Sequence, residues 1–146
     1  MNTFSFNGQA TIKHLNPRKE GPEDEKALAL DIKLCGTVPA DLWDYFHEGI
    51  KEALYTDAGA AKNALMEAIG FNHAVSNCTM EILEQRFHGV EVSKFKLKPK
   101  DGWKAELTFS VTISPDSNEI AQFAEFLQDE VSLVLMPEPD LFNEQG

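Results

Sequence analysis

Cysteines, long apolar runs and targeting signals are scarce or absent in this chain of 146 residues. Two cysteines, Cys35 and Cys78, do not form the dense disulfide framework of a small secreted domain, so we expect both to be reduced thiols. No apolar run approaches the length of a membrane-spanning helix, about 18 residues. The N-terminus, MNTFSFNGQA, lacks the basic and apolar regions of a signal peptide. These absences predict a cytoplasmic protein.

Recognisable catalytic and metal-binding motifs are missing as well. The four histidines are scattered, with no HExxH or CxxC pattern. Neither a GxSxG nucleophile motif nor a phosphate-cradling glycine loop is present. We therefore predict that the chain is not an enzyme, and we nominate no catalytic residue, metal ligand or cofactor.

Basic residues are few, and their distribution is uneven. The chain has 13 basic and 24 acidic side chains, a net charge of −11, which argues against coating of duplex DNA. Residues 116–146 contain eight acidic and no basic residues, a local charge of −8. Residues 86–104 contain six basic and two acidic residues, a local charge of +4. The net charge therefore does not exclude an anionic ligand at one place on the surface.

The spacing of apolar residues predicts an α+β fold. Helical spacing in residues 39–55 and 117–127 predicts two helices, and the alanine-rich residues 57–69 predict a shorter one. Alternating apolar and polar residues predict strands in six segments: 3–15, 28–35, 71–82, 86–98, 103–114 and 131–136. Because each strand has one wet face, we expect a single domain over residues 1–136, a mainly antiparallel sheet of about six strands with two or three helices packed on one face.

Local signals refine this expectation. Residues 16–25, NPRKEGPEDE, are typical of an exposed hairpin loop. The apolar positions change phase between Val92 and Phe95, which predicts a β-bulge near Ser93. Residues 137–146 have two prolines and three acidic residues, and we expect an exposed acidic tail.

The basic segment has two interpretations. Its lysines alternate along one strand and continue through the following turn: Lys94, Lys96, Lys98, Lys100 and Lys104. Such a row beside Phe95 and Trp103 is typical of proteins that hold the phosphates of single-stranded nucleic acid and stack its bases. Alternatively, the lysines protect an exposed strand edge from aggregation, or meet an acidic partner, while the two aromatic residues fill the core. The alternation places both aromatic side chains opposite the lysines and favours the core for them.

The acidic end of the chain is the second candidate surface. The tail sequence EPDLF, Glu138 to Phe142, resembles the pentapeptide QLDLF with which bacterial replication and repair proteins dock on the sliding clamp. Alternatively, the Leu-Phe pair folds back onto the domain. The candidate partner-binding residues of the last helix and the tail are Glu119, Glu125, Asp129, Glu130, Asp140, Leu141 and Phe142.

One longer stretch suggests a biological setting. The segment FSFNGQATIKHLNPRKEGPEDEKALALDIKL, Phe4 to Leu34, resembles small proteins encoded by phages and prophages, and the similarity extends to QRFHGVEV, Gln85 to Val92. No function is attached to that family. The resemblance implies the cytoplasm of a bacterial host and an accessory role.

Three hypotheses of function follow. The first is a non-enzymatic phage accessory protein that binds a host or phage protein of nucleic-acid processing or defence, such as an anti-defence inhibitor with an acidic, DNA-mimicking surface. The second is a single-stranded-DNA-binding or recombination accessory protein with a lysine-lined groove and an acidic tail that recruits partners. The third is a structural component of the virion.

Overall fold

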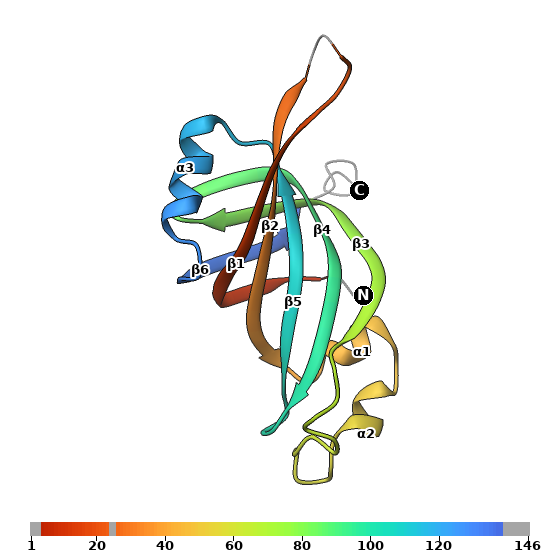
Figure 1. Ribbon diagram of the computed structural model, residues 1–146. Helices are drawn as coiled ribbons and strands as arrows, with labels where there is room; N and C mark the ends of the chain where they lie inside the picture. Colours follow the sequence, from red (N-terminus) through yellow and green to blue (C-terminus); the bar gives the residue numbers. More distant parts are fainter. Residues whose placement is uncertain (1–3, 24–25, 139–146) are drawn as a thin grey trace.

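Six antiparallel strands close into one barrel in the computed structural model, which describes residues 4–23 and 26–138. The strands follow one another around the barrel in the order β1-β2-β5-β4-β3-β6, and β6 pairs with β1 (Figure 1). Their bounds are β1 Phe6–Glu20, β2 Ala27–Pro39, β3 Ile69–Ile82, β4 Gln85–Lys100, β5 Lys104–Ile113 and β6 Glu130–Pro137. The three short helices are α1 Leu42–Phe46, α2 Ile50–Leu54 and α3 Ser117–Glu125. The predicted single small domain with a mainly antiparallel six-stranded sheet is confirmed.

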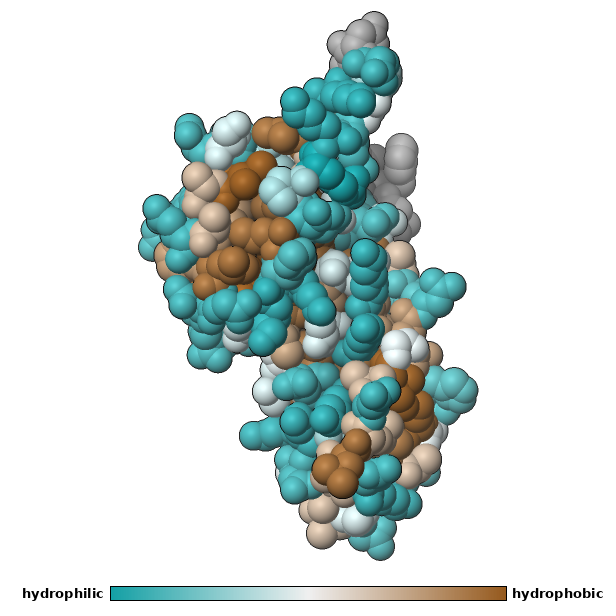
Figure 2. Space-filling view, in the orientation of Figure 1, coloured by the Kyte–Doolittle hydropathy of each residue, from teal (hydrophilic) through white to brown (hydrophobic). Residues whose placement is uncertain are grey.

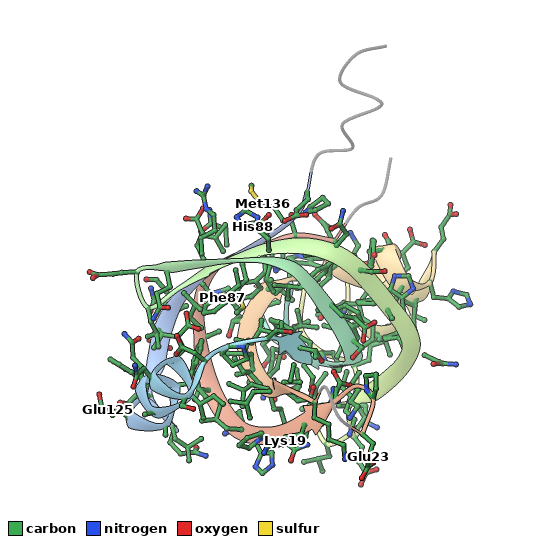
Figure 3. All side chains as sticks on the ribbon, turned by 90° about the horizontal axis from the view of Figure 1, so that it is seen from above. Lys19, Glu23, Phe87, His88, Glu125 and Met136 are labelled. Atoms are coloured by element: carbon green, nitrogen blue, oxygen red, sulfur yellow. The ribbon has the colours of Figure 1, made fainter. Side chains whose placement is uncertain are left out.

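The interior of the barrel is the hydrophobic core. Alternation along each strand sends apolar residues inward, so that Ile12, Leu34 and Phe109 are 0% exposed. Viewed from above, the strands surround a space filled with side chains (Figure 3). In the described part of the chain no charged or strongly polar side chain is fully buried. The barrel is therefore a packed core, and any ligand has to bind on its outer surface or at its ends.

The helices lie at the two ends of the barrel. In Figure 1, α1 and α2 are at the lower end and α3 is at the upper end. Trp43 of α1 and Phe123 of α3 are both 0% exposed and belong to the core. The structure thus does not confirm that the helices pack over one face of the sheet, because the sheet closes on itself and strand side chains fill its inner face. None of these three helices is long and apolar enough to cross a membrane.

The predicted loop at residues 16–25 is wrong in its extent. β1 continues to Glu20 and β2 starts at Ala27, and these two residues pair with each other. The β2–β5 pairing ends at Leu30↔Ile113, so the hairpin continues beyond the barrel as a two-stranded arm (Figure 1). On the β1 side of this arm, Lys19 and Glu20 are exposed and Arg18 is half-buried, so this segment lacks the apolar alternation that reveals a strand.

The helical predictions also need correction. The segment 39–55 forms two short helices, because the chain is extended at His47 and left-handed at Gly49, where φ is 90°. The carboxylate of Asp44 accepts a hydrogen bond from the Gly49 N–H and stabilises this break. Residues 57–69 form no helix, although their alanine content favours one. Instead, Tyr55 bridges to Ala61 in an irregular connection.

Two strand-level predictions are confirmed and one is wrong. The β4–β5 register shifts between Ser93 and Lys96, where the sequence predicts a bulge. Cys35 and Cys78 are both free cysteines. Trp103, however, does not fill the core: it lies in the β4–β5 turn with φ 58°, remains 43% exposed and stacks on Tyr55 with ring centroids 5.5 Å apart.

Gly59 lies directly under Trp103, and this contact predicts a sensitive position. A Cβ atom at Gly59 would come within 2.4 Å of the indole, and the glycine has φ +89°. Gly59→Ala is therefore expected to lower the free energy of unfolding by about 3 kcal/mol, from left-handed strain and overlap together. Gly49→Ala is the matched control: its φ is +90° and its Cβ would meet nothing within 4 Å, so about 1 kcal/mol is expected. Equal losses in urea unfolding would contradict this account.

Candidate functional site

Two hollows on the outside of the barrel meet at the same pair of lysines, Lys94 and Lys96 of β4. The first, called here the lysine groove, has a volume of about 330 Å³ and is lined by His14, Asn16, Asp31, Lys33, Lys94, Lys96, Thr108 and Ser110. The second, called here the aromatic hollow, has a volume of about 490 Å³ and is lined by Gly70, Phe71, Asn72, His73, Ala74, Ser93, Lys94, Phe95 and Lys96. Both volumes fall in the range of small-ligand sites.

Strand pairing assembles the lysine groove from four strands. Lys33 of β2 pairs with His14 of β1 on one side and with Ser110 of β5 on the other. In the neighbouring row, Lys96 of β4 pairs with Thr108. Three ammonium groups and two hydroxyl groups thereby line one depression. Figure 2 shows hydrophilic side chains running across the middle of this face, between two more apolar areas.

The bulge in β4 explains why Lys94 points outward. Val92 and Phe95 both point into the core, and two residues lie between them where regular alternation allows one. Ser93 and Lys94 are therefore on the outer side of the strand one after the other. Lys94 has φ 56°, a left-handed backbone that non-glycine residues adopt at a cost of about 1–2 kcal/mol. Strain of this kind gathers at functional sites, and here it places a cation where the two hollows meet.

Among the described residues that line the lysine groove, the one carboxylate is Asp31, and it is paired with Arg18, which also pairs with Glu20. Asp31 accepts hydrogen bonds from Arg18 Nε at 2.9 Å and from Thr112 Oγ1 at 2.7 Å. The Arg18 guanidinium, above all, lowers the pKa of Asp31, and Asp31 and Glu20 raise the pKa of Arg18. Among the described residues, no acidic group lies within salt-bridge distance of Lys33, Lys94 or Lys96. The groove therefore presents three lysines that have no acidic partner in the described part of the chain.

The Asp31–Arg18 pair predicts a pH-dependent stability. Because the folded-state pKa of Asp31 lies below its ordinary value of 3.8, the pair stabilises the fold at neutral pH and loses this effect as the pH falls through the folded pKa. Asp31→Asn is expected to lower the free energy of unfolding by about 0.5–1 kcal/mol at pH 7, because solvent screens this partly exposed pair. Urea titrations across pH should show this difference shrinking below pH 4. A difference that stays constant down to pH 2.5 would contradict the assignment.

The aromatic hollow has a buried floor and one exposed ring. Phe95 is buried at its base, and Phe71 stacks on Phe46 of α1 with ring centroids 4.6 Å apart. His73 is exposed, and its Nε2 lies 2.9 Å from the hydroxyl of Tyr45. Burial raises the pKa of Tyr45, so this hydroxyl keeps its proton and can donate to the imidazole. The hollow thus offers flat rings beside Lys94 and Lys96.

The structure separates the five lysines that the sequence nominates. Lys94 and Lys96 line both hollows. Lys98 is half-buried and lies opposite Glu106 in the β4–β5 register, and Lys100 lies opposite Lys104 beside the turn. None of these three lysines lines either hollow. The edge-protection interpretation is wrong, because β4 pairs with β3 on one side and with β5 on the other. The expectation that Phe95 belongs to the core is confirmed.

The acidic residues nominated at the end of the chain do not all lie on one helix. Glu119 forms a capping box with Asp116: its carboxylate accepts from the Asp116 N–H at 2.9 Å. Glu125 is exposed on α3 (Figure 3). Asp129 and Glu130 follow the helix and are exposed. Asp140, Leu141 and Phe142 lie outside the described residues.

The start of the predicted tail is part of the barrel. β6 includes Pro137, and Glu138 Oε1 lies 2.8 Å from His88 Nδ1 and accepts a hydrogen bond from Thr79 Oγ1 at 3.1 Å. The His88 contact is the main reason why the pKa of Glu138 is lowered. His88 and Met136 lie on the side of the barrel where the described chain ends (Figure 3). The domain therefore extends to at least Glu138, two residues beyond the predicted boundary.

The sequence does not identify four of the residues that line the two hollows: His14, Lys33, Phe71 and His73. The alternation in residues 28–35 already places Lys33 on the outward face. What it does not show is that β2 neighbours β5, and β5 neighbours β4.

Across residues 4–23 and 26–138, no three His, Cys, Asp or Glu side chains are grouped as a metal site.

Comparison with known proteins adds no constraint on the function. No protein-family model, no curated protein and no solved structure matches this chain.

Proposed function

We propose that this protein binds single-stranded nucleic acid across β4, with phosphates in the lysine groove and a base in the aromatic hollow. The observation that carries the proposal is that Lys94 and Lys96 line both hollows. A nucleic-acid strand that passes over Lys94 and Lys96 places its charged backbone against the ammonium groups of the lysine groove. Its bases can then reach the rings of the aromatic hollow. Phosphate neutralisation combined with stacking is how sequence-tolerant single-strand binders work.

The negative net charge does not oppose binding at this place. At physiological ionic strength the Debye length is about 8 Å, so exposed charges farther away are largely screened. Near the groove, the Asp31 carboxylate is paired with Arg18, and Lys33, Lys94 and Lys96 have no acidic partner among the described residues. The rest of the acidic surface instead disfavours extended contact with a duplex.

The aromatic hollow favours a single strand over a duplex. Stacking on Phe71 or His73 requires a base whose face is free, and the bases of a duplex are already stacked on one another. Ser110, half-buried between the lysines, supplies a hydroxyl donor for phosphate oxygens, whereas the Thr108 hydroxyl donates to Cys35 Sγ at 3.7 Å.

The salt dependence of oligonucleotide binding tests the proposal. With three lysine–phosphate contacts, the logarithm of the association constant should fall with the logarithm of salt concentration with a slope of about −2. Binding of a fluorescein-labelled oligo-dT to the wild-type chain, followed by anisotropy, should therefore weaken about 20-fold between 50 and 200 mM NaCl. Absence of binding at 50 mM NaCl, or a duplex bound as tightly as the single strand, would sink the proposal.

A protein-binding accessory role remains the second proposal. Its acidic residues are distributed over several elements, and Glu119 already caps its own helix. One observation still favours it: Glu130 borders a separate groove beside α3. The phage setting, the anti-defence activity and the virion-component hypothesis stay predictions, and the presence or absence of the chain in purified particles tests the last of them.

A further inference from the structure

A groove beside α3 combines apolar and acidic side chains and lies apart from the lysine groove. Its volume is about 870 Å³, and it is bordered by α3, β6, β1 and the β3–β4 hairpin. Half-buried Leu83, Phe126 and Val134 provide its apolar surface. Figure 2 shows apolar side chains gathered beside α3 and rimmed by hydrophilic ones.

Most polar side chains of this groove are paired with one another, and two carboxylates are not. Gln9 Nε2 donates to Ser132 Oγ at 2.7 Å, and Gln85 donates to Gln122. Arg86 pairs with Glu81 at 2.7 Å. By contrast, Glu84 and Glu130 are exposed, and neither has a cationic partner within the described chain. With Glu81 offset by Arg86, the groove carries a net charge of about −2.

The hairpin tip is a second, independent observation. Ile82 pairs with Gln85, so Leu83 and Glu84 form a two-residue turn with φ 51° and 62°. Turns of this kind strongly favour Asn-Gly, because both central residues have left-handed backbones. Leu83 recovers part of the conformational cost by packing against the core. The Glu84 side chain makes no hydrogen bond or ion pair within the described chain, so its place in this turn has no structural explanation.

We infer that the groove beside α3 binds a basic segment of a partner protein, whose apolar side chain contacts Leu83, Phe126 and Val134 while flanking lysine or arginine residues pair with Glu84 and Glu130. Charge complementarity selects this occupant over an acidic peptide or a nucleic acid. The apolar surface between the carboxylates selects a segment that carries at least one large apolar side chain. The inference is independent of oligonucleotide binding at the lysine groove.

The test uses a short fluorescein-labelled peptide in which lysine and arginine flank a Leu-Phe pair, and a control peptide with serine in place of Leu and Phe. Anisotropy should show that the wild-type chain binds the first peptide at least tenfold more tightly than the second. Glu84→Gln combined with Glu130→Gln should weaken binding about tenfold, from the loss of two ion pairs. The matched control, Glu48→Gln with Glu67→Gln, removes the same charge from exposed sites elsewhere and should leave binding unchanged.

Glu84→Gly separates binding from folding. Glycine relieves the left-handed strain of the turn, so the urea midpoint should stay the same or rise while peptide affinity falls several-fold. Equal losses in the two double variants would show only a general attraction to an acidic chain and overturn the inference. Equal affinity for both peptides, or a protein dimer that covers the groove and excludes the peptide, would overturn it as well. Oligo-dT affinity should not fall in any of these variants, so this test and that of the lysine groove fail separately.

Discussion

Replacing Lys33, Lys94 and Lys96 together by glutamine is expected to weaken oligo-dT binding about 500-fold at 50 mM NaCl. Each lysine–phosphate contact on a single strand contributes about 0.7 to the exponent of the salt dependence. At a salt concentration of 0.05 M, three contacts therefore raise the association constant by a factor of about 0.05 to the power −2.1, which is about 500. The same substitution should bring the salt slope from about −2 to near zero. Anisotropy titrations at four salt concentrations measure both quantities in one series.

The matched control removes three other lysines. Lys19, Lys26 and Lys62 are exposed and lie outside both hollows, so replacing them by glutamine changes the net charge equally. We expect less than a threefold change in affinity. If this control variant loses as much affinity as the groove variant, binding depends on total charge and the lysine groove is not the site.

The second large effect is expected at the end of the barrel. Trp43 is 0% exposed, its Nε1 donates to the Tyr55 hydroxyl at 3.0 Å, and its ring lies edge-on to Phe71. Trp43→Ala removes this packing and should lower the free energy of unfolding by about 3–5 kcal/mol. Because Phe71 lines the aromatic hollow, oligo-dT affinity should also fall wherever the variant remains folded.

Trp43→Phe serves as the comparison for this prediction. It keeps a ring in the core and loses the hydrogen bond to Tyr55, so we expect a loss of about 1–2 kcal/mol. Urea unfolding of both variants gives the ranking. A loss below about 1 kcal/mol for Trp43→Ala would show that α1 does not help to close the barrel.

The strands could be predicted from the sequence, and the closure of the barrel could not. Period-two alternation depends on each strand having one inward face, and this local pattern locates the cores of all six strands. Closure depends on β6 pairing with both β1 and β3, which is a contact between the two ends of the chain. The continuation of β1 beyond Leu15 is missed because its exposed, charged side chains leave no periodic signal. The break at Gly49 is missed because a single left-handed residue leaves none either.

The candidate site, too, could be predicted only in the part that depends on local sequence. The outward placement of Lys94 and Lys96 and the bulge near Ser93 follow from local sequence, because a one-residue change of phase is visible within β4. Lys33 comes from β2 and His73 from β3, and only the strand order brings Lys33 to the lysine groove and His73 to the aromatic hollow. The edge-protection interpretation failed for the same reason, since an edge cannot be recognised without knowing the neighbours of a strand.

The most direct test of the central claim is amide chemical-shift mapping of the ¹⁵N-labelled chain titrated with oligo-dT. Our account predicts that the shifts concentrate at Lys33, His73, Lys94, Lys96 and Ser110 and leave the groove beside α3 unchanged. Shifts confined to α3 and the β3–β4 hairpin, or no shifts at saturating oligonucleotide in 50 mM NaCl, would contradict it.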